Sequence, residues 1–148
     1  MTSTTKSRKK RGSLGHVLVV EDDAILCMAI EQALLDGGAR SVHCCASTDA
    51  ALAELESRRP DLVILDVHLA DRDDGWAIAE LLTQLGPKPP RIVFSTANPG
   101  VIPAHIAELG TILEKPYAPE TLIAALQASP RKVGLIGRLL GEPATSGP

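Results

Sequence analysis

The stretch "LVILDVHLADRDDGW", residues 62–76, places an aspartate, Asp66, directly after four consecutive apolar residues. A continuous apolar run of this length is typical of a strand buried on both faces, as in a parallel sheet covered by helices. Burying an unpaired charge is costly, so a carboxylate in this position must face a cation or water. We therefore expect Asp66 to end a strand in a polar site, although a solvated aspartate that opens a loop fits this stretch alone equally well.

Similar apolar runs alternate with helical patterns along the chain. The expected strands are residues 16–20, 41–45, 62–66, 89–97 and 111–114. The expected helices are the segment between the first two strands and residues 48–59, 75–85 and 119–128. Between the last two strands, Pro99, Gly100 and Pro103 predict that any helix is short or irregular. Five strand–helix units at this length predict a doubly wound α/β domain with a five-stranded parallel sheet.

The first expected helix has clear end signals. Asp22 or Asp23 can cap its start, and Gly37 with Gly38 can end it. Apolar residues at steps of three and four predict one apolar face, which would consist of Ile25, Met28, Ala29, Ala33 and Leu34.

The composition is that of an ordinary globular domain. The chain has 148 residues, of which 45% are hydrophobic and 22% charged, enough for one domain with a full core. Aromatic residues make up only 2%, so the core must be aliphatic and a nucleic-acid surface built on base stacking is disfavoured. No apolar stretch approaches the ~20 residues that a membrane span needs.

Charge is distributed unevenly along the chain. Residues 1–15 contain five basic and no acidic side chains, whereas the remainder has 10 basic and 18 acidic ones, a net charge of −8. We expect residues 1–15 to be a disordered basic arm, with contact to phosphate or anionic lipid as the alternative. Residues 129–148 are expected to be a partly ordered tail, with a partner-docking segment as the alternative. No secretory signal is recognisable, so we expect a cytoplasmic protein.

The three cysteines, Cys27, Cys44 and Cys45, lack metal-binding or redox spacing. Each lies in an apolar segment, so we expect buried free thiols that pack as small hydrophobic groups, with a redox role as the alternative.

Polar side chains gather where the expected strands end, which in a parallel sheet is one common edge. They are Glu21, Asp22 and Asp23 after the first strand, Asp66 on the third, Ser95 and Thr96 on the fourth, and Glu114, Lys115 and Pro116 on the fifth. Converging carboxylates repel one another and need a cation, and Mg²⁺ suits a few oxygen ligands that leave room for water. A lysine and a hydroxyl opposite could cradle a phosphoryl group, with Asp66 as the nucleophile.

The motifs "VLVVEDD", "DLVILDVHL", "FSTA" and "EKP" together resemble the receiver domain of bacterial two-component response regulators, over residues 16–128. The resemblance implies a flavodoxin-like sheet with strand order 2-1-3-4-5. It also implies that Asp66 accepts a phosphoryl group from a histidine kinase or a histidine phosphotransfer protein. Because the resemblance covers most of the chain, we expect a stand-alone regulator without a DNA-binding domain.

The resemblance also assigns roles around Asp66. Asp22 would bind Mg²⁺ directly and Glu21 mostly through water, and the backbone carbonyl of His68 would be a further ligand. Thr96 would donate a hydrogen bond to the phosphoryl oxygens, and Lys115 would neutralise their charge.

Three departures from the family pattern stand out. Ile112 occupies the position of the usual aromatic switch residue, Ala70 replaces a common proline, and Gly75 comes one residue late. With "FSTAN", these changes resemble a subgroup of stand-alone receivers whose fourth strand reads Phe-Ala-Thr-Gly, and they leave open how the output surface responds.

The expected function is therefore signalling rather than turnover of a substrate, with output through protein contact or phosphorelay to an unidentified partner. Two alternatives are a degenerate receiver that serves only as an interaction module and a Mg²⁺-dependent phosphohydrolase like the haloacid dehalogenases. The latter requires a second aspartate two residues after the nucleophile, where this chain has His68.

Overall fold

The computed structural model describes residues 13–68 and 76–128. Strands and helices alternate along these ranges as the sequence predicts. In chain order they are β1 (Gly15–Val20), α2 (Ala24–Asp36), β2 (Ala39–Cys45), α3 (Thr48–Ser57), β3 (Leu62–Asp66), α4 (Trp76–Leu82), β4 (Arg91–Thr96), the 3₁₀ helix η1 (Pro99–Val101), α5 (Ala104–Ala107), β5 (Thr111–Glu114) and α6 (Pro119–Gln127).

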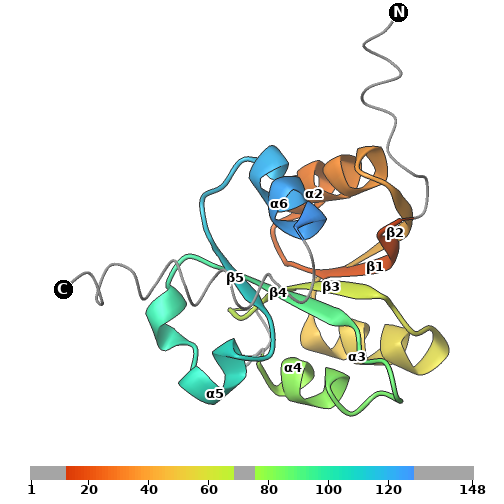
Figure 1. Ribbon diagram of the computed structural model, residues 1–148, viewed down its shortest axis with the longest axis vertical. Helices are drawn as coiled ribbons and strands as arrows, with labels where there is room; N and C mark the ends of the chain where they lie inside the picture. The colour runs from red at the N-terminus through yellow and green to blue at the C-terminus, as the bar shows by residue number, and fades with distance from the viewer. Residues whose placement is uncertain (1–12, 69–75, 129–148) are drawn as a thin grey trace, which may run out of the picture.

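The strands form one parallel sheet in the order β2-β1-β3-β4-β5, which confirms the predicted doubly wound fold. Helices α2 and α6 cover one face of the sheet, and α3, α4 and α5 cover the other (Figure 1). Each face has its own aliphatic core. The core under α3, α4 and α5 includes Leu18, Val20, Val63, Leu65, Ile78, Leu82, Phe94 and Ile106, and the core under α2 and α6 includes Val17, Val19, Ile30, Leu34, Ile64, Val93, Leu122 and Leu126.

Strand β3 lies at the centre of the sheet, between β1 and β4. All five of its residues are buried, and successive side chains enter opposite cores. This explains why the stretch is continuously apolar until Asp66, since neither face of the strand meets solvent.

Helix α2 begins and ends as predicted, but the face that it buries only overlaps the predicted one. Asp23 is its cap, with Oδ1 accepting hydrogen bonds from the backbone N–H groups of Ile25 and Leu26. The predicted apolar face is only partly correct, because Leu34 is buried but Ile25 is 81% exposed and Met28 is 69% exposed. The residues buried on this helix are Cys27, Ile30 and Leu34.

The other boundaries shift by a few residues. Strand β2 starts two residues earlier than expected. Helix α4 ends at Leu82, because the N–H groups of Gln84 and Leu85 donate to the carbonyls three residues before them, and Gly86 follows. Gly86 has a φ of 69°, a left-handed conformation that favours glycine. The expectations for residues 1–12, for Ala70 and Gly75, and for residues 129–148 lie outside the described residues.

The connection between β4 and β5 is irregular, as the prolines predict. It contains only η1 and the four-residue α5. Gly110 then leads into β5, and a Cβ atom at this position would collide with the backbone carbonyl of Ile92 on β4.

Within the described ranges, none of the helices combines the length and apolar character needed to cross a bilayer.

Candidate functional site

The carboxyl ends of the central strands bring three acidic residues together. Glu21 and Asp22 directly follow β1, and Asp66 is the last residue of β3. One carboxylate oxygen from each of the three lies within 4.8 Å of the others. The convergence that the sequence predicts at this edge of the sheet is therefore present.

Asp66 is buried, with only 4% of its surface exposed, and both of its carboxylate oxygens have partners. Its Oδ1 atom accepts a hydrogen bond from the backbone N–H of His68 at 2.9 Å. Its Oδ2 atom lies 3.3 Å from the Nζ atom of Lys115. These contacts exclude the alternative of a solvated aspartate that merely opens a loop.

Lys115 lies between two carboxylates. Its Nζ atom is 2.9 Å from Oε1 of Glu21 as well as 3.3 Å from Asp66. The backbone of Lys115 is anchored to β4, because its N–H donates to the carbonyl of Thr96 at 2.7 Å. The peptide bond that follows, to Pro116, is cis. Burial lowers the pKa of Lys115, but the hydrogen bond to Glu21 and the charges of Asp66 and Glu21 outweigh it and raise the pKa overall.

Glu21 is a deeply buried carboxylate whose pKa is strongly shifted. It is 3% exposed, and its Oε2 atom accepts a hydrogen bond from the Asp23 N–H at 3.1 Å. Its pKa is raised to about 7, chiefly by burial and further by the charge of Asp66, although Lys115 and the Asp23 N–H act to lower it. The position therefore disfavours an ionised carboxylate unless more positive charge is supplied.

The donor set fits a divalent cation. Three carboxylates face one ammonium group, so the cluster carries two uncompensated negative charges when all its members are ionised. The Oε1 atom of Glu21 is buried, and its partner among the described residues is the Nζ atom of Lys115. Asp22 is exposed, which leaves one side of the cluster open to water. Clustered carboxylate oxygens that retain water are the environment that Mg²⁺ prefers.

Thr96 ends β4 next to this cluster. Asp66 pairs with Ser95 in the register of β3 and β4, so Thr96 lies one residue further along the neighbouring strand. It is 1% exposed, and its Oγ1 atom accepts a hydrogen bond from the backbone N–H of Asn98 at 3.0 Å. The hydroxyl hydrogen remains available for a further acceptor.

A hydrogen bond between Ser95 and Tyr117 was not anticipated from the sequence. The Ser95 Oγ and Tyr117 Oη atoms are 2.8 Å apart, which joins β4 to the segment that follows Lys115. Two features of the sequence could have indicated it: Ser95 is a polar residue inside the apolar run "IVFST", and Tyr117 follows Lys115 by two residues. Ile112, by contrast, is partly buried and packs against the core under α3, α4 and α5.

The cysteine prediction is only partly correct. Cys27 and Cys45 are buried, but Cys44 is exposed. Both Cys44 and Cys45 lie on the edge strand β2, but on opposite faces of it, and only Cys45 enters a core.

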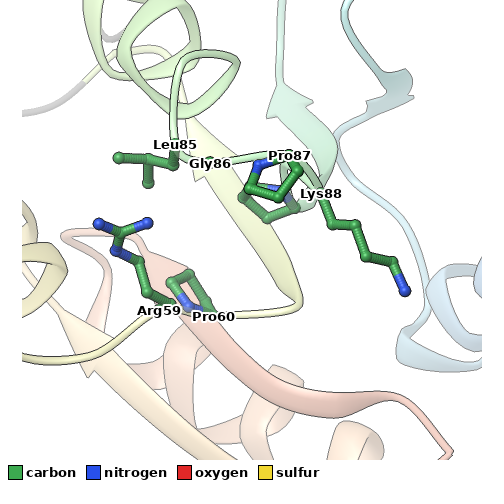
Figure 2. A pocket seen from close by; sticks show the side chains of 7 residues that line it. Arg59, Pro60, Leu85, Gly86, Pro87 and Lys88 are labelled. Atoms are coloured by element: carbon green, nitrogen blue, oxygen red, sulfur yellow. The ribbon is translucent and has the colours of Figure 1, made fainter.

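A cavity of about 170 Å³ lies at the opposite end of the strands from the acidic cluster, between the segments that lead into β3 and β4 (Figure 2). Three prolines and Leu85 form much of its wall, and Figure 2 shows Arg59 extending toward Leu85 while Lys88 points away. It lies at the amino ends of the strands and is separate from the candidate site.

Comparison with known proteins identifies the same domain. A family model described as the response regulator receiver domain matches residues 17–127. Sensory transduction protein LytT of Enterococcus faecalis is 30% identical over 123 residues, which cover 80% of this chain and 49% of that protein. Transcriptional regulatory protein PdtaR of Mycobacterium tuberculosis is 28% identical over 132 residues, which cover 88% and 63%. The chain thus spans less than two thirds of either relative.

Solved structures agree with this assignment. A CheY-like receiver domain from Methylobacillus flagellatus superposes with a TM-score of 0.69 at 27% identity, covering 78% of this chain and 98% of that one. The chemotaxis response regulator CheY4 of Vibrio cholerae superposes with a TM-score of 0.65 at 26% identity and the same coverage.

Proposed function

The chain belongs to the family of response regulator receiver domains, and we propose that it takes a phosphoryl group on Asp66 from a histidine kinase or a histidine phosphotransfer protein. The observation that carries the proposal is the contact of Asp66 with Lys115 inside a cluster of three carboxylates. A buried carboxylate with an ammonium group on one side and a cation site on the other is suited to form an acyl phosphate.

Each neighbour of Asp66 would contribute a separate effect. Glu21, Asp22 and Asp66 would hold Mg²⁺, together with the backbone carbonyl of His68. The ion would supply positive charge that offsets the oxygens of the incoming phosphoryl group. Lys115 would stabilise the same oxygens from the other side, since charge-assisted hydrogen bonds are roughly twice as strong as neutral ones. Thr96 would donate its hydroxyl hydrogen to one of them.

In the proposed step, one Asp66 oxygen forms a bond to phosphorus while the bond from phosphorus to the donor's histidine nitrogen breaks. The phosphoryl group then adds negative charge beside Lys115 and Thr96. Such a change shifts the equilibrium between two conformations only by the difference in its interactions with each. Output through contact with another protein, or transfer of the phosphoryl group onward, follows from that shift.

The full set of ionisable groups favours this function over a degenerate receiver. Lys115 contacts both Glu21 and Asp66, so the three side chains form one connected cluster. The phosphohydrolase alternative lacks support, because position 68 provides a histidine in place of the second aspartate.

The test is phosphorylation by a small phosphodonor. The full chain is incubated with acetyl phosphate, with and without Mg²⁺, and its intact mass is measured. We expect the mass of one added phosphoryl group in the presence of Mg²⁺ and no addition after chelation. Asp66→Asn should show no addition. An Asp61→Asn variant, altered at an acidic residue before β3, should behave as wild type. An unmodified wild-type mass in Mg²⁺ would overturn the proposal.

A further inference from the structure

Two of the three cysteines meet where α2 packs on the edge of the sheet. Cys44 pairs with Val19 in the register of β1 and β2, and Val19 belongs to the core under α2 and α6. Cys44 is therefore on the face toward α2, where its thiol donates a hydrogen bond to the carbonyl oxygen of Cys27 at 3.9 Å.

Cys45 is next to Cys44 in the chain but faces the other core. It pairs with Val20 and packs with Leu18 and Ala51. Because successive side chains of a strand point to opposite faces, the sheet separates Cys45 from the other two thiols. The chain thus holds one facing pair of cysteines and, one residue away, a third that serves as an internal control.

The facing pair is accessible to small molecules. Cys44 is exposed, and Cys27 is 7% exposed. Both line a cavity of about 270 Å³ that is also bounded by Glu21 and Asp22, so the pair lies beside the acidic cluster. Cys45 lines this cavity as well, at the end of β2, but it packs in the core on the other face of the sheet. A peroxide is small enough to enter a space of this volume.

We propose that Cys27 and Cys44 are a redox modification site, at which a peroxide forms a reversible disulfide that joins α2 to β2. In the first step the sulfur of Cys44 bonds to one peroxide oxygen, the O–O bond breaks, and water or an alcohol leaves with the thiol proton. In the second step the sulfur of Cys27 bonds to the sulfur of the resulting sulfenic acid, the S–O bond breaks, and water leaves. The two thiols lose two electrons in total, and the peroxide gains them.

The surroundings of the pair decide how readily it reacts. Burial raises the pKa of the Cys27 thiol, and the carboxylates of Glu21, Glu31 and Asp23 raise it further. Burial also raises the pKa of Cys44 well above its ordinary value, with contributions from Cys27 and Glu31. The thiolate is the reactive form, so both groups react slowly near neutral pH. An excess of oxidant is therefore needed to close the bridge.

The bridge would act close to the proposed metal ligands. Cys27 is in the first turn of α2, and that helix begins one residue after its cap, Asp23, which itself follows Asp22. A covalent link to the edge strand would therefore fix the start of α2 relative to the sheet. Formation of the disulfide does not depend on phosphorylation of Asp66, so the two proposals succeed or fail separately.

The experiment counts free thiols in the full chain after incubation with excess hydrogen peroxide. The protein is denatured, alkylated with N-ethylmaleimide and weighed. The reduced protein should carry three labels, one for each cysteine, and the oxidised protein one label and two fewer hydrogen atoms. Dithiothreitol should restore three labels, and peptide mapping should join Cys27 to Cys44.

Serine variants distinguish the pair Cys27 and Cys44 from Cys45. Cys45→Ser should still form the disulfide, and Cys44→Ser should not, although both remove one thiol at adjacent positions. The proposal is overturned if the wild-type protein keeps three reactive thiols or gains only oxygen. It is also overturned if the link joins Cys44 to Cys45 or two chains, or if Cys44→Ser forms the link as readily as wild type.

Discussion

At the scale of single residues, Glu21 determines how the acidic cluster responds to pH. Its pKa is about 7 in the folded protein, compared with 4.5 for an unperturbed glutamate. Between these values the folded state keeps a proton that the unfolded state has released, so rising pH lowers the free energy of unfolding across this interval. The stability that this proton provides is fully present below the lower value and is lost as pH passes the upper one.

We therefore predict that Glu21→Gln reduces the pH dependence of stability. Urea unfolding of wild type and variant at about pH 5 and about pH 8 should give a smaller difference for the variant. Mg²⁺ should restore part of the wild-type stability at the higher pH, because a divalent ion favours the ionised carboxylate. Equal pH dependence in the two proteins would show that Glu21 keeps an ordinary pKa.

Lys115 is predicted to stabilise the fold as well as the phosphoryl group. Lys115→Met leaves Glu21 and Asp66 facing each other without a cation, which should lower the free energy of unfolding by about 2 kcal/mol at neutral pH. Urea unfolding would measure this loss. Mg²⁺ should recover more stability in the variant than in wild type. Lys88→Met, at an exposed lysine remote from the cluster, is the matched control and should change little.

The positions of these residues could be anticipated because each follows an apolar run at a strand's end. Their protonation could not, because the pKa of Glu21 depends on how deeply the folded chain buries it. The hydrogen bond between Ser95 and Tyr117 joins residues 22 positions apart. It depends on which face of β4 carries Ser95 and on where the segment after β5 places Tyr117. Such a contact requires the three-dimensional register.

At the scale of secondary structure, the adjacent residues Asp22 and Asp23 have different structural roles. Asp23 caps α2, whereas Asp22 joins the acidic cluster. Asp23→Ala should lower the free energy of unfolding by about 1 kcal/mol, as loss of a helix cap usually does. Asp22→Ala should cost less stability but weaken Mg²⁺ binding more strongly. Urea unfolding and Mg²⁺ titration of both variants would show this difference, and identical profiles would contradict it.

Gly110 is predicted to be essential for the approach of β5 to β4. A Cβ atom there would collide with the carbonyl of Ile92, so Gly110→Ala should lower the free energy of unfolding by about 2 kcal/mol or more. Urea unfolding provides the measurement. At Gly100 the nearest atom to an added Cβ would be the Asn98 Oδ1 at 3.5 Å, an ordinary contact. Gly100→Ala should therefore be tolerated, and a similar loss in both variants would contradict this account.

The partly incorrect face of α2 shows what the sequence could not predict about a single helix. The sequence "AILCMAI" places apolar residues around most of the first two turns, so more than one helical stripe fits it. The cap was identifiable from the sequence, but the rotation of the helix depends on its packing against β1 and β2. That packing buries Cys27 and leaves Ile25 and Met28 in solvent.

At the scale of the whole molecule, the layered arrangement explains why a few scattered motifs form one site. Because all the strands are parallel, the ends of β1, β3, β4 and β5 lie at the same edge of the sheet (Figure 1). The apolar runs and the order of the motifs were sufficient to anticipate this arrangement. The same arrangement makes the central claim testable by chemistry at one residue.

The most direct test of that claim is to locate the phosphoryl group after reaction with acetyl phosphate and Mg²⁺. Borohydride reduces an aspartyl phosphate to homoserine, which marks the modified residue permanently for peptide mass spectrometry. We predict homoserine at position 66 and at no other aspartate. Homoserine at Asp22 or Asp23, or phosphate recovered only on serine, threonine or histidine, would contradict the account.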